Sequence, residues 1–372
     1  MFLIITGLIG LWLGTKWIIN GALGIAKRFN LSHSFVGVAI LAVGTDLPEV
    51  FVTVKACLLH LRGIESSGII TGNAIGSSIS QITFILGVAG LLLNFTITKR
   101  DLWRDGIALI TSIVLLFAFG IDGIISRLEG VILLMMYLLY YIVLMRNKTV
   151  NTDDNSKGKD YSNTALALFL LFGFIVLIIS SHLVVGNAMQ LAEKWGVAQS
   201  FIGIAIIGLG TSLPELAVSV GAALRKSAGM SVGNIIGSNI FDGFIPIGLG
   251  AAIRPTNMEG NLLKFDLPVL LTVTLLVLIF LKTKRGISKP EGILLIVIFL
   301  LYIVENCRIY QLTIRETEIA KLICQGQKYK GIGETVFIAE RTITKHAQNI
   351  FEKVDVSNKI ELINKLEYTG SD

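Results

Sequence analysis

Long apolar stretches with almost no charge fill most of this 372-residue chain, from its start to about residue 305. Charged residues make up only 16% of the chain, against about 25% in soluble domains. A helix that spans a bilayer needs about 20 mostly apolar residues. The sequence therefore predicts an all-α, polytopic membrane protein. Its ten transmembrane helices are expected near 2–26, 34–60, 66–94, 103–120, 124–145, 163–192, 199–224, 229–252, 266–282 and 290–305.

The first apolar stretch has no basic leader and no small-residue cleavage site, which favours a retained helix over a signal peptide. The polar segment 147–162 separates two groups of five helices. Beyond residue 306 the composition becomes that of a soluble protein. The expected domains are therefore a first five-helix repeat at 1–146, a polar loop at 147–162, a second repeat at 163–306 and a C-terminal domain at 307–372.

Three motifs of the first group recur in the second group in the same order. The paired segments are 34–37 with 200–203, 44–49 with 210–215, and 72–79 with 233–240. Because each group holds an odd number of spans, the second copy must enter the membrane from the opposite side. Such inverted repeats are typical of secondary transporters, which bind their substrate near the membrane midplane between the repeats.

Glu49 and Glu215 lie inside apolar helices, at the same place in the two repeats. A charged side chain at the bilayer centre costs at least about 2.5 kcal/mol, so such residues are functional candidates by default. No Lys or Arg lies within one helical turn of either acid. A structural ion pair with a base on another helix remains the alternative.

The neighbours of both acids supply further oxygen atoms. Pro48 and Pro214 have no N–H, so each is expected to kink its helix and free a carbonyl. Thr45 and Thr211 lie one turn before the acids and share their face. Carboxylate, hydroxyl and carbonyl oxygens suit a hard cation such as calcium or sodium.

The second motif adds polar groups one turn apart. Asp242 follows Ser238 by four residues, and Gln81 follows Ser77 by four. We expect Asp242, as an intramembrane acid, to bind an ion. The motif glycines form small-xxx-small patterns that predict close helix packing, at Gly72, Gly76, Gly233 and Gly237.

The paired G-T-x-x-P-E and G-N-x-x-G-S motifs resemble the α-repeats of the sodium/calcium exchanger superfamily over about 1–305. The resemblance implies ten helices, alternating access, and exchange of Ca²⁺ for Na⁺ or H⁺, so the chain would be a transporter and not an enzyme. It implies no cofactor besides the transported ions. It places the metal-binding acids at Glu49, Glu215 and Asp242, beside Gln81. The ion shell would be completed by Thr45, Thr211, Ser212, Ser77 and Ser238.

Four positions depart from the superfamily's pattern, and two of them matter most. Asp46 stands where a Ser is usual, and Gln81 stands where an Asn or Asp is usual. Ser78 and Ser80 also differ from the common motif. Asp46 is an added candidate ligand that would change the ion stoichiometry or bind a proton, unless its side chain points away from the site. Both departures leave the coupling ion open.

Residues 311–366 resemble the LuxR-type helix-turn-helix family. Thr313 and Glu316 form a capping box, and helices are expected near 329–336, near 340–353 and from about 357. Further family residues are Arg315, Glu318, Gly326, Arg341, Thr342, Ile343, Lys353, Val354, Val356, Ser357 and Asn358. The resemblance implies DNA and a second copy of the chain as partners, and a bacterial inner membrane as the location. The DNA contacts would fall on Thr344, Lys345, His346 and Asn349.

The predicted topology conflicts with this DNA-binding role. With the N-terminus outside, the inner loops hold fifteen basic residues and the outer loops five, as the positive-inside rule requires. Ten spans then place residue 372 outside, away from DNA. Either a span is miscounted, or the segment binds no DNA, or it contacts protein. The alternative function is a membrane-tethered transcription regulator with the membrane part as a cation sensor.

Overall fold

The structure, a computed structural model, describes residues 2–61, 67–92, 97–146, 161–194, 208–258, 262–284, 286–310, 319–320, 322–323, 327–335, 340–354, 358–359 and 361–362. The chain divides into two compact units, Met1–Leu301 and Tyr302–Asp372. The boundary between them falls inside a helix.

The first repeat is helical almost throughout the described residues, and two of its membrane helices contain π-helical turns. Its elements are α1 (Phe2–Arg28), α2 (His33–Val36), η1 (Gly37–Ala42), α3 (Val43–Thr45), α4 (Leu47–Leu61), α5 (Ser67–Ser80), η2 (Gln81–Ile85), α6 (Leu86–Leu92), α7 (Lys99–Gly120) and α8 (Arg127–Arg146). π-Helical turns often occur at functional sites, and both of these lie beside candidate ligands.

The second repeat follows the same order. Its elements are α9 (Asn163–Lys194), α11 (Gly208–Thr211), α12 (Leu213–Leu224), α13 (Ala228–Ile253), η4 (Leu262–Asp266), α14 (Leu267–Lys284) and α15 (Lys289–Tyr310). The expected start of the second helix in this repeat, 199–207, lies outside the described residues.

Among the described residues, eight segments are long and apolar enough to cross a membrane. The shorter apolar helix α12 and the helix α15 occupy the second and fifth positions of the second repeat. The helical, multi-pass architecture predicted from the sequence is therefore confirmed.

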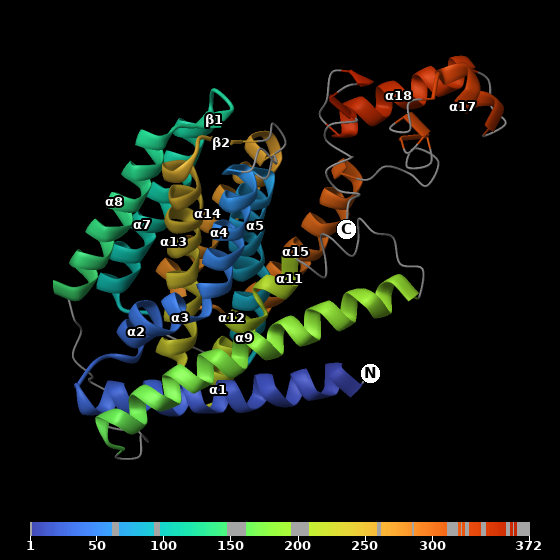
Figure 1. The fold of residues 1–372 in the computed structure, drawn as a ribbon. Helices are drawn as coiled ribbons and strands as arrows, with labels where there is room; N and C mark the ends of the chain where they lie inside the picture. Colours follow the sequence, from blue (N-terminus) through green and yellow to red (C-terminus); the bar gives the residue numbers. More distant parts are fainter. Residues whose placement is uncertain are drawn as a thin grey trace. The chain divides into compact units, whose positions relative to one another are not determined.

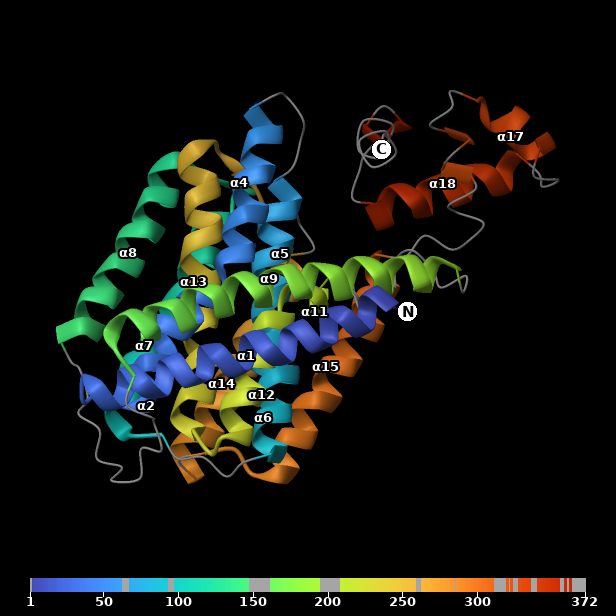
Figure 2. The same cartoon turned by 60° about the horizontal axis from the view of Figure 1, so that its bottom comes forward.

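The membrane unit is a bundle crossed by one helix pair. In Figures 1 and 2, α1 and α9 run side by side at a steep angle to α4, α5, α7, α8, α13 and α14. Helix α13 lies inside the bundle, where it contacts η1, α5, α7, α8 and α12. Most of α13 is buried, whereas α8 and α9 expose much of their apolar surface. The polar residues of α13 are therefore shielded from lipid.

Glycines allow the closest approaches between helices. A Cβ added at Gly14 of α1 would stand 2.9 Å from the carbonyl oxygen of Gly173 in α9. A Cβ at Gly233 would stand 2.5 Å from the carbonyl oxygen of Ser34, and one at Gly237 would stand 2.9 Å from Val38 Cα. The predicted close packing of the motif glycines is thus confirmed in the second repeat.

The same prediction is not tested for the first repeat. Apart from their own helix, no described atom lies within 4 Å of a Cβ built at Gly72 or Gly76. The segment that matches 34–37 in the second repeat, 200–203, lies outside the described residues.

Two helix starts differ from their predicted positions for local reasons. Helix α7 begins at Lys99, because the Thr98 hydroxyl accepts the Asp101 N–H and caps the helix. Helix α8 begins at Arg127, because β1 (Ile124–Ile125) pairs antiparallel with β2 (Thr256–Asn257). This ladder joins the α7–α8 connection to the connection after α13.

The C-terminal unit has its own small core. Its described helices are α17 (Tyr329–Thr335) and α18 (Glu340–Val354). The core consists of the buried residues Ile319, Ala320, Ile323, Ile332, Ile343, Ala347, Ile350 and Leu362. The helices expected near 329–336 and 340–353 are confirmed, while the capping box at 313–316 lies outside the described residues.

Candidate functional site: a buried carboxylate cluster

Each repeat carries a helix that is interrupted at one residue. Asp46, with φ −81° and ψ 3°, separates α3 from α4. Ser212, with φ −86° and ψ 11°, separates α11 from α12. Pro48 and Pro214 follow two residues later, in the first turn of the next helix, where a missing N–H is tolerated. The predicted kinks are therefore confirmed as breaks, located just before each proline.

The interrupted helices bring three acids together. One carboxylate oxygen from each of Asp46, Glu49 and Glu215 lies within 4.8 Å of the other two. All three residues are fully buried, and none of their six carboxylate oxygens has a hydrogen-bond partner among the described residues. Unsatisfied buried carboxylates are strongly unfavourable without a counter-charge. The cluster is therefore suited to hold a cation.

Asp46 belongs to this cluster. The sequence left open whether its side chain points away from the site. It does not, because its carboxylate is buried beside those of Glu49 and Glu215. The residue at the helix break therefore adds a third carboxylate to the two motif acids.

Asp242 adds a fourth carboxylate from α13. Its Oδ2 accepts a hydrogen bond from Gln81 Nε2 at 3.1 Å, while its Oδ1 has no partner among the described residues. It is fully buried and interacts electrostatically with Asp46 and Glu49. Gln81 in turn accepts a hydrogen bond at Oε1 from Asn239 Nδ2, at 3.0 Å. Gln81 therefore orients the fourth acid and is itself fixed by α13.

The expected hydroxyl groups link the two repeats. Ser77 Oγ and Thr211 Oγ1 are 3.2 Å apart, and Thr45 Oγ1 donates to Asn234 Oδ1 at 3.4 Å. Ser212 Oγ accepts from Ser80 Oγ at 3.0 Å. Ser238 Oγ is buried without a partner among the described atoms. Nine of the ten candidate ion ligands are buried where the repeats meet, and the tenth, Thr211, is half-buried.

Sequence reasoning missed three polar residues that support this arrangement. Asn234 donates to Ser219 Oγ at 3.0 Å, while Asn239 bridges Gln81 and its own helix. Ser80, which follows the second motif of the first repeat, donates a hydrogen bond to Ser212 at the helix break of the second repeat. Asn234 stands in the repeated G-N-x-x-G-S motif, where Asn73 is its counterpart, so its recurrence was the signal that could have identified it. Asn239 has Ser78 as its counterpart and offered no such signal.

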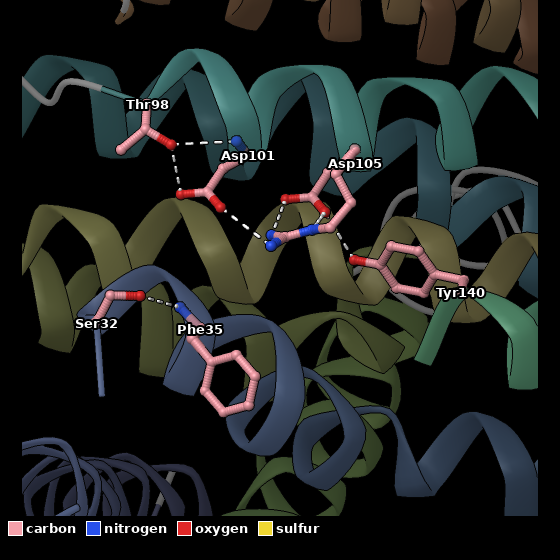
Figure 3. A network of polar contacts seen from close by, with 7 residues as sticks. Ser32, Phe35, Thr98, Asp101, Asp105 and Tyr140 are labelled. Carbon is pink, nitrogen blue, oxygen red and sulfur yellow. Dashed lines mark hydrogen bonds and ion pairs between the residues drawn. The ribbon is translucent and has the colours of Figure 1, made fainter. Parts of the chain in front are cut away.

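The structural alternative required a basic partner for the acids. In the described part of the chain, none of Asp46, Glu49, Glu215 and Asp242 forms an ion pair. The ion pairs of α7 lie elsewhere and join Arg104 to Asp101 and Asp105. Figure 3 shows the two aspartates of that network with Tyr140, whose hydroxyl donates to Asp105 at 2.9 Å. Four buried acids without a described base form an oxygen-lined site that suits a hard cation.

The predicted DNA contacts lie on α18. Thr344 and Lys345 are exposed and His346 is half-buried, while Asn349 lies in the same helix. The opposite side of α18 supplies three residues to the core, Ile343, Ala347 and Ile350. The helix therefore presents a polar face with Lys345 on it.

The family model described as "Sodium/calcium exchanger protein" matches residues 1–146 and 165–307. The chain belongs to the sodium/calcium exchanger family. A second model, described as "Bacterial regulatory proteins, luxR family", matches residues 310–366. Both resemblances inferred from the motifs are confirmed.

Relatives and solved structures agree with this assignment. An uncharacterized membrane protein of Methanocaldococcus jannaschii, MJ0091, is 32% identical over 80% of this chain and 94% of its own length. The sodium/calcium exchanger MaX1 of Methanosarcina acetivorans is 28% identical, over 81% and 97%. A structure of the sodium-calcium exchanger NCX_Mj superimposes with a TM-score of 0.71 at 30% identity, over 81% of this chain and 97% of that one.

As a member of the exchanger family, the chain is a multi-pass membrane transporter, not an enzyme, and its membrane unit is a cation antiporter. The carboxylate cluster lies where the two exchanger repeats meet, which is where inverted-repeat transporters hold their substrate.

Proposed function

We propose that this exchanger moves Ca²⁺ against Na⁺ or H⁺ by alternating access, with the buried carboxylate cluster as the transport site. The observation that carries the proposal is the group Asp46, Glu49 and Glu215, buried without hydrogen-bond partners among the described residues. Asp242 completes the site from α13. Two of the similar proteins support these ions, because MaX1 is named a sodium/calcium exchanger and NCX_Mj was soaked with Na⁺ and Ca²⁺.

The charge of the site explains why exchange, and not leak, would result. Calcium loses its hydration shell on entry, and several carboxylates are needed to offset that loss. Monovalent cations would occupy the same oxygens and neutralise the same acids, so the two substrates would exclude one another. An empty site would keep its buried negative charges, which disfavours its reorientation through the protein.

Seven polar side chains complete the proposed shell around the acids. Gln81 holds Asp242 in place by a hydrogen bond of 3.1 Å. The hydroxyls would offer neutral oxygens to the smaller charge of a monovalent ion. They are Thr45, Ser77, Thr211, Ser212 and Ser238, with Ser80 joining them from α5.

The test is ⁴⁵Ca²⁺ uptake into proteoliposomes that contain the full chain. Calcium should accumulate when the lumen is loaded with Na⁺ or is acidic, and the gradient that drives uptake identifies the coupling ion. Asp122→Asn serves as a matched control, because this acid is exposed near the β1 turn, away from the site. Absence of Ca²⁺ uptake under both gradients would overturn the proposal.

A second proposed function concerns residues 307–372, which we treat as a separate domain that binds DNA as a dimer. It is favoured by the LuxR-family match and by the exposed Thr344 and Lys345 on α18. In this reading the membrane unit, in a bacterial inner membrane, would also act as a cation sensor. The C-terminal domain could bind DNA only from the cytoplasm, whereas the positive-inside count with ten spans predicts that this domain lies outside.

Reporters fused after residue 372 decide between these locations. A fluorescent protein active only in the cytoplasm would support DNA binding, and a phosphatase active only outside would exclude it. If the end is cytoplasmic, Lys345→Ala in the full chain should weaken DNA binding at low salt. The matched control is Lys328→Ala, which removes an exposed charge outside α18.

A further inference from the structure

A groove on the outer surface of the membrane unit lies between α7 and α14. We propose that this groove binds an anionic phospholipid, with an acyl chain along its apolar part and the phosphate at Lys282. The groove has a volume of about 200 Å³, and its lining includes Trp103, Ile107, Leu275, Ile279 and Lys282. The proposal is independent of the transport site, because none of its residues belongs to the carboxylate cluster.

The apolar part of the groove faces the surroundings of the bundle. Trp103, Ile107 and Ile279 are 62%, 58% and 56% exposed. The floor is formed where α7 approaches α14, because a Cβ at Gly106 would stand 3.0 Å from Leu278 Cδ2. In a bilayer such a surface is covered by lipid, and an apolar groove between two helices can hold an acyl chain.

Only one end of the groove is charged, and that charge is positive. Lys282 lines the groove near the end of α14, and Lys99 is exposed in the first turn of α7. Helix α14 contains no acidic residue. The groove end therefore offers the Lys282 ammonium group to a phosphate, with Lys99 at the same end of the neighbouring helix.

The acids of α7 do not cancel this positive charge. Asp101 and Asp105 are only 2% and 4% exposed and turn into the protein, where Arg104 pairs with both. Asp105 also accepts the Tyr140 hydroxyl, as Figure 3 shows. Both acids are therefore absent from the groove surface. Among the described residues of α7 and α14, no acid offsets the positive charge of Lys282.

The position of the groove fits an anionic lipid of the inner leaflet. Trp103 lies in the first two turns of α7, at the depth where tryptophan anchors a helix at the headgroup level. The positive-inside count places the start of α7 and the end of α14 on the cytoplasmic side. Anionic lipids are enriched there, and basic pockets between helices bind their headgroups.

Native mass spectrometry of the full chain tests the proposal. The protein is released from micelles that contain phosphatidylglycerol and phosphatidylcholine with identical acyl chains in equal amounts. Phosphatidylglycerol should be retained preferentially, and Lys282→Gln should reduce its retention by about fivefold, as expected for one basic residue near the membrane surface. Lys289→Gln, an exposed lysine at the start of α15 outside the groove, should leave retention unchanged.

A second variant tests the apolar part without changing charge. Ile107→Trp should fill the groove and reduce phosphatidylglycerol retention, while the exposed position spares the protein core. Equal retention of both lipids, or equal losses in Lys282→Gln and Lys289→Gln, would overturn the proposal. It would also be overturned if soluble glycerol phosphate displaced the lipid, or if a second copy of the chain occupied the groove in its place.

Discussion

The two repeats contribute the same number of acids to the site but carry them at different positions. At the helix break the first repeat has Asp46 and the second has Ser212. Four residues after the motif serine, the first repeat has Gln81 and the second has Asp242. With Glu49 and Glu215, each repeat supplies two buried carboxylates. The first repeat therefore has an acid at its helix break and an amide in its second motif. The second repeat has a serine at its helix break and an acid in its second motif.

The described contacts of the second motifs also differ between the repeats. Gly233 and Gly237 lie against the π-helical turn and its neighbours, whereas Gly72 and Gly76 face open space among the described residues. The second-repeat motif is thus packed against the first repeat, whereas residues 200–203, which match 34–37 in sequence, lie outside the described residues. The difference in the acids can be tested by exchanging residues between the repeats.

The largest expected effect comes from the acids that the repeats share. Glu49→Gln or Glu215→Gln should reduce ⁴⁵Ca²⁺ uptake to the level of protein-free liposomes, because each removes a buried charge that a divalent ion needs. Both variants should elute as the parent protein does, since neither acid has a hydrogen-bond partner to lose among the described residues. Near-normal uptake in both variants would disprove the site assignment.

The next effect concerns folding stability and separates the glycines of the two repeats. Gly237→Ala should destabilise the protein by about 1–3 kcal/mol, because its methyl group would collide with backbone at Val38. Gly76→Ala, the matched change in the first repeat, should be neutral or stabilising by up to about 1 kcal/mol if only the described residues surround it. Thermal unfolding in detergent measures both. Equal destabilisation would mean that a segment outside the described residues packs against Gly76.

Exchange of the acid at the break should have an intermediate effect. Asp46→Ser makes the break of the first repeat match that of the second, and it should weaken Ca²⁺ binding by about tenfold, since affinity follows the charge of the ligands. The double variant Asp46→Ser, Gln81→Asp restores four carboxylates and should recover most of the affinity. Calorimetric titration measures both, and a double variant as weak as the single one would refute the compensation.

The smallest effect is expected at the amide. Gln81→Asn shortens the side chain by one methylene and should break its hydrogen bond to Asp242. One such bond contributes about 1 kcal/mol, so the apparent Ca²⁺ affinity in uptake assays should fall by about fivefold. Ser78→Ala, a change at a neighbouring buried residue outside the predicted ion shell, is the comparison. Equal behaviour of the two variants would mean that Gln81 does not position the acid.

The sequence by itself determined the spans, the inverted repeat and the motif acids. Apolar stretches of membrane length can satisfy their backbone groups only as helices. A carboxylate placed twice in equivalent apolar helices identified Glu49 and Glu215 without coordinates. The family models match the same regions.

Only the tertiary structure decided where Asp46 points, how closely Gly233 and Gly237 pack, and how Gln81 is used. These outcomes depend on contacts between residues more than 150 positions apart, such as Gln81 with Asp242 and Gly237 with Val38. Helical periodicity gives the direction of a side chain within its own helix, and the break at Asp46 interrupts that periodicity at the decisive residue. Its orientation was therefore fixed by the packing of the two repeats against each other.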